Sequence, residues 1–416
     1  MELDEGFCIA GLPQSDLTIQ KMILTQCAVC ATELGLSSGK KCGRCSTRYC
    51  GPQCQVQHWK EGGHDQLCKP IKKAGGAEQY NANNKYAEAV TVAAEKCAED
   101  TKGQTCYICT EAVHRHTKEG LVRGCACRGT AGFAHVSCLA EQAKILVTEA
   151  EENNLFDKAN ERWLRWDTCS LCEQEYHGVV KCALGWVCWK TYVGRPETDR
   201  SRTAAMNVLA NGLADTKHHE DALTVLLAQL SMYRRVGESE YNILVAQTNI
   251  ANSYQMLGRP DEALRLQRDV SAGYAKFLGE EHENTLIAAL NYALNLFGLH
   301  KFEEAKSLLR KTVPVARHVL GESDDTTIRM RSVYAGALCK DTGATLDDLR
   351  EAVTTLEEIE RIARRVFGGA YPRVMDIQGN VEIARAALRA REGDVDALRE
   401  AVEAMTPPGS APSAYA

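Results

Sequence analysis

Closely spaced pairs of cysteine and histidine constrain this chain more than any other feature. Its 416 residues include 19 cysteines, and 16 of these lie before residue 173. The first residues carry acids early and no long apolar run, so they do not resemble a secretory signal. In a reducing compartment disulfides rarely persist, and paired cysteines are more often metal ligands. We therefore expect metal-binding modules in the first half, in a protein of the cytoplasm or, alternatively, the nucleus.

The first Cys-rich segment offers eight ligands in four pairs. They are Cys27, Cys30, Cys42, Cys45, Cys50, Cys54, His64 and Cys68. Two residues between cysteines form a tight knuckle that directs both thiolates at one metal, whereas three place the ligands one helical turn apart. Zinc takes four sulfur or nitrogen ligands in a tetrahedron, so eight ligands predict two zinc ions. So short a segment could hardly fold without the metal, which makes the predicted role structural.

The pair spacing and the string YCGPQCQVQHW at residues 49–59 closely resemble the MYND-type zinc finger over its full length. In that family the pairs interleave. Carried over, one zinc takes Cys27, Cys30, Cys50 and Cys54, and the other takes Cys42, Cys45, His64 and Cys68. The resemblance also implies binding of short peptides, often proline-rich. His58 is a rival ligand, although the set of eight is complete without it.

A second Cys-rich segment again offers eight ligands. They are Cys106, Cys109, Cys125, Cys127, His135, Cys138, Cys169 and Cys172. This order fits either a RING-CH finger or a PHD finger. One residue separates Cys125 from Cys127, seven separate Cys127 from His135, and Asp167 stands where PHD fingers tend to carry tryptophan. With the string CACRGTAGFAHVSCL, these features resemble the RING-CH finger.

The RING-CH resemblance implies a cross-brace with two more zinc ions, four in the chain. One ion takes Cys106, Cys109, His135 and Cys138, and the other takes Cys125, Cys127, Cys169 and Cys172. It also implies a ubiquitin-protein ligase that holds a ubiquitin-conjugating enzyme near Ile108, so that catalysis is positioning. Alternatively, Ile108 packs its own knuckle.

Three features depart from active members of that family. Gln142 lies near the place of a frequent tryptophan, 30 residues separate Cys138 from Cys169, and no basic residue directly follows Cys172. The 30-residue insert is predicted to form one or two helices. An insert that covers Ile108 would favour a scaffold, and an accessible Ile108 would favour a ligase.

The second half of the chain repeats. Gly237, Gly279 and Gly321 are each 42 residues apart, as are Ala263 and Ala305. Each unit is predicted to be a helix, a polar turn, a second helix and a glycine stop, in which alanine allows close helix contact. Such a period predicts a solenoid of four units and a terminal helix pair. It resembles the longer tetratricopeptide repeats of kinesin light chains.

Asn207, Asn249 and Asn291 also recur at 42 residues, on the first helix of each unit. The resemblance implies that their amides bind a peptide backbone on the concave face. A structural role, in capping or bonding between repeats, is an equal alternative.

The expected fold class is mainly α, with two small cross-brace zinc-finger modules followed by an α-helical tetratricopeptide-like solenoid. The expected parts are a MYND finger (22–73), a linker with a helix near 86–98 (74–100), a RING-CH finger (101–178), a connecting segment (179–199), the repeats (200–405) and a disordered tail (406–416).

Charge and hydropathy limit the classes of partner. The net charge is −6, which argues against nucleic acid binding through general positive charge. Residues 27–73 are basic and could meet an acidic surface, or simply form a solvated face. No apolar stretch is long enough to span a bilayer. The expected partners are therefore proteins or peptides, including a ubiquitin-conjugating enzyme.

The sequence is compatible with two functions. The first is a RING-CH-type ubiquitin-protein ligase whose MYND finger and repeats bind targets. The alternative is a non-catalytic scaffold that uses both fingers and the solenoid to bind peptides. A lysine methyltransferase is disfavoured, since the space between the modules holds the second finger and no SET-like stretch.

Overall fold

The computed structural model describes residues 27–30, 32, 34, 39–369 and 372–405. These residues form two compact units, one up to Glu238 and the other from Ser239 onward. Fifteen α-helices and one two-stranded sheet lie in the described residues, so the prediction of a mainly α fold is confirmed. None of the described helices combines the length and hydropathy needed to cross a membrane.

The first finger is a small hairpin followed by two helices. Strand β1 (Lys40–Lys41) pairs antiparallel with β2 (Arg48–Tyr49), and α1 (Pro52–Lys60) and α2 (His64–Ala74) follow. Proline fits the first turn of α1 because its missing N–H would have no partner there. The core of this finger consists of the ligand cysteines with Tyr49, Leu34 and Ile71.

A single long helix joins the two fingers. Helix α2 ends at Gly75 and Gly76, which both have positive φ, and α3 (Ala77–Cys97) begins immediately after them. The linker helix therefore starts nine residues earlier than the sequence-based expectation of 86–98. The buried side chains of this earlier part, Ala77, Asn81 and Ala82, extend its packed face toward the first finger.

The second finger consists of loops that the insert extends with helices. Bridges join Val122 to Ala134 and Thr168 to Glu175. The insert forms the rest of α4 (Val136–Glu152), then α5 (Phe156–Trp163) and the short 3₁₀ turn η1 (Leu164–Trp166). The helical insert predicted from the sequence is therefore present.

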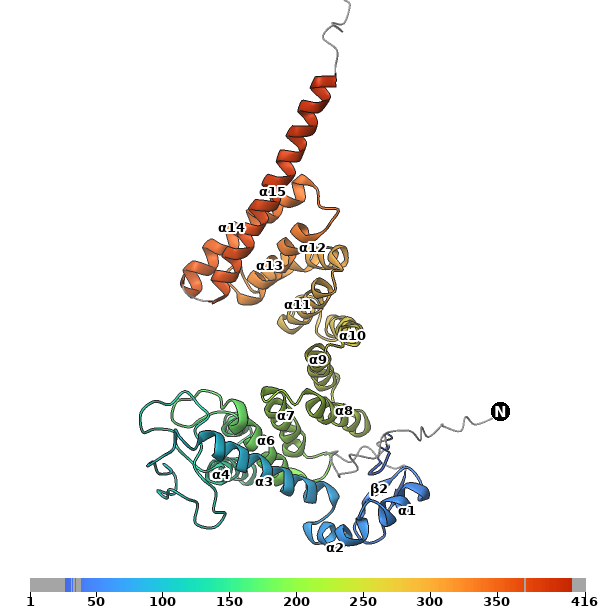
Figure 1. Ribbon diagram of the computed structural model, residues 1–416, viewed down its shortest axis with the longest axis vertical. Helices are drawn as coiled ribbons and strands as arrows, with labels where there is room; N and C mark the ends of the chain where they lie inside the picture. The colour runs from blue at the N-terminus through green and yellow to red at the C-terminus, as the bar shows by residue number, and fades with distance from the viewer. Residues whose placement is uncertain (1–26, 31, 33, 35–38, 370–371, 406–416) are drawn as a thin grey trace, which may run out of the picture. The chain divides into compact units, whose positions relative to one another are not determined.

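Helix α6 (Gly178–Tyr192) connects the second finger to the repeats and is buried over most of its length. It packs against α3, α4 and α7 (Arg200–Asp215), and α3 and α6 lie side by side in Figure 1. A Cβ atom at Gly212 of α7 would lie 2.8 Å from the Lys181 carbonyl oxygen of α6. Helices α6 and α7 therefore approach too closely there for any side chain. Helix α8 (His219–Val236) completes this unit.

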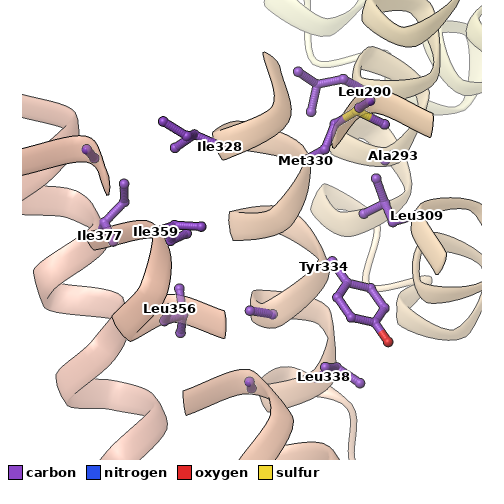
Figure 2. Packing of buried hydrophobic residues seen from close by; sticks show 14 of the residues in the cluster. Leu290, Ala293, Leu309, Ile328, Met330, Tyr334, Leu338, Leu356, Ile359 and Ile377 are labelled. Atoms are coloured by element: carbon purple, nitrogen blue, oxygen red, sulfur yellow. The ribbon is translucent and has the colours of Figure 1, made fainter. Parts of the chain in front are cut away.

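The second unit is a succession of helix pairs. Its helices are α9 (Glu240–Met256), α10 (Pro260–Leu278), α11 (Glu283–Gly298), α12 (Phe302–Val319), α13 (Asp325–Lys340), α14 (Leu346–Phe367) and α15 (Pro372–Met405). Each helix packs against the next one in sequence. Figure 2 shows the largest core of this unit, where Leu290 of α11, Met330 of α13 and Ile359 of α14 come from two successive pairs.

The repeat glycines end the second helix of each pair. Gly237, Gly279, Gly321 and Gly368 all have positive φ, between 70° and 91°. Glycine adopts this conformation without the steric cost that a Cβ atom brings. One difference concerns the end of the solenoid, where the expected helix pair is the single 34-residue helix α15. Gly379 and Gly393 both lie inside it, because a helix tolerates a glycine at a cost of about 1 kcal/mol each.

Candidate metal centres and finger surfaces

The structure gathers the sixteen candidate ligands into four groups of four. In each group the ligand atoms all lie within 4.8 Å of one another. The groups are Cys27, Cys30, Cys50, Cys54; Cys42, Cys45, His64, Cys68; Cys106, Cys109, His135, Cys138; and Cys125, Cys127, Cys169, Cys172. These are the interleaved sets that the two family resemblances imply. Ligands from pairs as much as 47 residues apart meet because each finger folds as a cross-brace.

In two of the groups a sulfur–sulfur distance matches that expected around a tetrahedral zinc ion. The Sγ atoms of Cys42 and Cys68 are 3.8 Å apart, as are those of Cys127 and Cys169. Zinc–sulfur bonds of about 2.3 Å in a tetrahedron place two sulfurs roughly 3.8 Å apart. The donor sets, Cys₄ and Cys₃His, are those of structural zinc sites.

The two ligand histidines each direct one ring nitrogen at their group. His64 Nε2 lies 3.4 Å from Cys45 Sγ, and His135 Nδ1 lies 3.4 Å from Cys109 Sγ. Both rings are fully buried. Burial lowers the pKa of His135, which favours the neutral imidazole that a metal requires.

The close packing of thiols opposes their simultaneous ionisation. Burial, and then hydrogen bonds to Cys50 and Cys30, raise the pKa of the Cys54 thiol. Burial likewise raises the pKa of Cys68, with its hydrogen bonds to Cys42 and Cys45 next in importance. Zinc binds thiolates, and a divalent cation at the centre of each group would compensate this repulsion.

His58, the rival ligand, lies outside all four groups. Its Nδ1 is 3.0 Å from the hydroxyl of Tyr49, and the residue is buried. Burial, and then the nearby His64, lower its pKa to about 4, so it is neutral at physiological pH. His58 therefore packs against the ring of the ligand His64, with ring centroids 4.8 Å apart, and is not itself in a ligand group.

In the second finger, two apolar side chains stand on facing knuckles. Ile108 is 38% exposed and Leu171 is 50% exposed, and each backbone N–H donates to the first cysteine of its own pair. The preceding residues join the two knuckles, since the Tyr107 hydroxyl lies 3.1 Å from Ser170 Oγ. We call Ile108 and Leu171 the knuckle shelf.

The helical insert borders this shelf and leaves it accessible. Ser170 Oγ also lies 3.5 Å from Gln142 Oε1 of α4, so Gln142 occupies the edge of the same surface. Arg165 of the insert donates to the Cys169 carbonyl at 3.3 Å. These contacts fix the insert beside the knuckles, whereas Ile108 itself remains exposed.

Sequence reasoning selected Ile108 but missed Leu171. The signal was present, because CYIC at 106–109 and CSLC at 169–172 have the same pattern, with an apolar residue before the second cysteine. The pairing of the two knuckles through Tyr107 and Ser170 required the structure.

The repeated asparagines are half-buried, on the first helices of their pairs. Asn207 lies on α7, Asn249 on α9 and Asn291 on α11. The backbone carbonyls of Asn249 and Asn291 accept bonds from Ser253 and Asn295. Among the described residues, no hydrogen bond is seen from the side-chain amides of Asn249 or Asn291.

Three family models match segments of this chain. The MYND finger matches residues 27–68, and the RING-variant domain matches residues 106–174. The tetratricopeptide repeat matches residues 201–276 and 242–318. The chain joins a MYND finger, a RING-variant domain and tetratricopeptide repeats. The three resemblances proposed from the sequence are thereby confirmed, and the RING-type assignment of the second finger is preferred over a PHD finger.

Solved structures with similar repeats are distant. Nearly identical TPR-like repeats attributed to a Podospora anserina kinesin light chain are 22% identical, with 56% of this chain and 97% of that chain covered and a TM-score of 0.38. BtubC from P. vanneervenii is 14% identical, with 68% and 97% covered and a TM-score of 0.38. No curated protein matches the chain.

Proposed function

We propose that this protein is a RING-variant ubiquitin-protein ligase of the cytoplasm or nucleus. Its zinc-finger and repeat modules are those of a protein that binds other proteins. We further propose that four zinc ions stabilise the folds of the two fingers. The second finger binds a ubiquitin-conjugating enzyme, and the first finger and the repeats bind target proteins.

The accessible knuckle shelf is the observation that carries this proposal. A RING-type finger has no nucleophile of its own. It binds the ubiquitin-loaded enzyme and holds it in a reactive geometry, which can contribute several kcal/mol through positioning. Exposed Ile108 and Leu171, one on each zinc knuckle, offer a small rigid apolar surface for such a partner. Both lie on backbone fixed by the zinc ligands beside them.

An autoubiquitination assay with a panel of conjugating enzymes tests the proposal. We expect the native chain to form ubiquitin conjugates with at least one enzyme. Ile108→Ala and Leu171→Ala should each lower the rate about 10-fold, as expected for central interface residues worth more than 1 kcal/mol. Val113→Ala is the matched control, because Val113 is an apolar residue of the same finger outside the shelf and is at least as exposed as the two shelf residues. Its rate should stay native.

Two departures favour the second candidate, a non-catalytic scaffold. Gln142 stands at the edge of the shelf where many ligases carry tryptophan, and the acidic Glu173 directly follows the last ligand. Silence of the folded, zinc-loaded protein across the whole panel would establish this alternative. Activity that neither shelf substitution changes would place the enzyme-binding surface elsewhere.

The asparagines fit a role in target binding better than one in repeat structure. A structural amide should be hydrogen-bonded within the protein, since a polar group buried without a partner costs free energy. The amides of Asn249 and Asn291 are half-buried and make no such bond among the described residues. We propose that they bind the backbone of an extended peptide.

A further inference from the structure

Four arginines converge on one pocket of the second unit. The pocket has a volume of about 310 Å³ and is lined by α12, by the turn after it, by α13 and by α14. Its charged side chains are Arg317, Glu322, Arg331, Glu358, Arg361 and Arg365. The pocket thus holds four guanidinium groups and two carboxylates, which is a surplus of two positive charges.

The buried arginine of this pocket is held in a fixed orientation. Arg331, on α13, is 4% exposed. Its Nη1 lies 3.0 Å from one oxygen of Glu322, and its Nη2 lies 2.5 Å from an oxygen of Glu358. Arg317 binds the other oxygen of Glu322 at 2.5 Å. The two bonds of Arg331 use only two of its five N–H groups, so an oriented guanidinium with further donors lines the pocket.

The repeat fold does not require these arginines. In the preceding repeat, 42 residues earlier, Ala275 stands at the position of Arg317, and Ala289 stands at the position of Arg331. Ala289 is buried, as Arg331 is. A buried guanidinium carries a desolvation cost that an alanine does not, even when carboxylates neutralise it. The arginines of this repeat therefore indicate a ligand rather than a demand of packing.

The other two arginines have no carboxylate partner in the described part of the chain. Arg361 and Arg365, both exposed, lie one turn apart on α14. Glu360, on the same helix, is bound by Arg364 instead, at 2.8 Å. A helix C-terminus favours cations in its last turn, which accounts for Arg365 but not for Arg361, and like charges four residues apart repel. These two guanidinium groups are therefore available to an anion.

We propose that this pocket binds the phosphate group of a phosphorylated side chain in a partner protein. A phosphate monoester carries about two negative charges near pH 7, which matches the surplus of the pocket. Its oxygens accept paired N–H donors from guanidinium groups in short, charge-assisted hydrogen bonds. Clusters of arginine are a recurrent means of binding phosphorylated segments of proteins.

A protein fits this pocket better than a nucleic acid or a membrane does. Nucleic acids and anionic membranes present many phosphates, and they are bound by extended sets of cations. One pocket of about 310 Å³ takes a single phosphate, and tetratricopeptide repeats are modules that bind proteins. The inference rests on the proposed binding of targets by the repeats, but it does not require that the second finger be a ligase.

Retention of peptide libraries by the immobilised full chain tests the pocket. The libraries are degenerate except at one fixed position, which holds phosphoserine, phosphothreonine, phosphotyrosine or the same residues unmodified. We expect the zinc-loaded native chain to retain at least one phosphorylated library about 10-fold more than its unmodified counterpart. Arg361→Gln with Arg365→Gln should abolish this preference and keep the native thermal midpoint, because both side chains are exposed. The matched control Arg364→Gln changes an exposed arginine between them that lies outside the pocket, and it should keep the preference.

Free phosphate and lipid vesicles serve as further probes. Inorganic phosphate should compete with the retained phosphopeptides, and chloride at the same ionic strength should not. Equal retention of phosphorylated and unmodified libraries would overturn the phosphate pocket but support peptide binding by the repeats, whereas retention of no library would contradict both. A preference that survives the double variant also overturns the proposal. So does binding to phosphatidylserine vesicles that the double variant loses, when no phosphorylated library is preferred.

Discussion

At the scale of single residues, one ion pair in the second unit stands at two positions that hold leucines in the preceding repeat. Lys306 and Asp341 are 42 residues after Leu264 and Leu299, and their side chains approach to 2.5 Å. Lys306 is 6% exposed, and Glu303 also binds it. A buried charge is tolerated when its partners neutralise it. This pair therefore fixes the turn after α13 against α12.

Substitution of one partner of the Lys306–Asp341 pair should lower the free energy of unfolding more than substitution of both. Asp341→Leu leaves the buried ammonium of Lys306 with only the exposed Glu303 as its partner. We expect the free energy of unfolding to fall by roughly 2–3 kcal/mol. The double change to leucine gives both positions the residues of the preceding repeat, leaves no buried charge, and should recover most of that loss. Native-state hydrogen exchange of the α12 and α13 amides measures both effects. A double variant less stable than Asp341→Leu would refute this account of the pair.

Of the candidate functional residues, the metal ligands were the ones best predicted from the sequence. Cysteine and histidine pairs are visible because a metal fixes their spacing, and all sixteen candidates meet in four groups. Leu171, the second residue of the knuckle shelf, was missed, because a contact between two separate knuckles leaves no local sequence pattern. The hydrogen bond between Tyr49 and His58 was missed for the same reason.

At the scale of helices, a close contact joins α6 to α7. A Cβ atom at Gly185 would lie 3.0 Å from the Leu209 Cα atom, and one at Gly212 would lie 2.9 Å from the Cys182 Cα atom. The glycines thus let the two backbones touch. Cys182 lies beside this contact, and both Cys182 and Cys188 of α6 are buried.

Gly212→Ala should therefore destabilise the contact between α6 and α7, even though alanine favours helix. Separating the helices should cost about 1–3 kcal/mol, the usual price of an overpacked core. Gly298→Ala is the control, because its Cβ atom would meet nothing within 4 Å at the end of α11. That change should be neutral or stabilise by up to about 1 kcal/mol. Hydrogen exchange of α6 and α7 reports the difference, and unchanged protection in Gly212→Ala would contradict it.

Helix boundaries were less predictable than helix identity. The glycine stops and the 42-residue period indicated the paired helices, because both are local or repeated signals. The start of α3 at Ala77 and the uninterrupted course of α15 were missed. Both depend on tertiary packing along a helix face, which overrides the local preference of glycine and polar residues.

At the scale of the whole molecule, both fingers and the first repeat helices form one compact unit. Glu78 of α3 pairs with Arg202 of α7 at 3.2 Å, and Glu151 of α4 pairs with Arg195 at 2.8 Å. Gln79 also donates to the Lys190 carbonyl of α6 at 3.0 Å. The segment after the second finger is therefore a packed connection within this unit. The second finger is held at a fixed position on the first repeat.

Everything proposed for this unit depends on zinc in the four ligand groups. Elemental analysis of the purified full chain should find about four zinc ions, one for each group of four ligands. Cys27→Ser with Cys50→Ser should remove one ion, because both belong to one group, whereas Cys27→Ser with Cys42→Ser should remove two. Far fewer than four ions in a native chain with both fingers folded, or equal losses in the two double variants, would contradict the account.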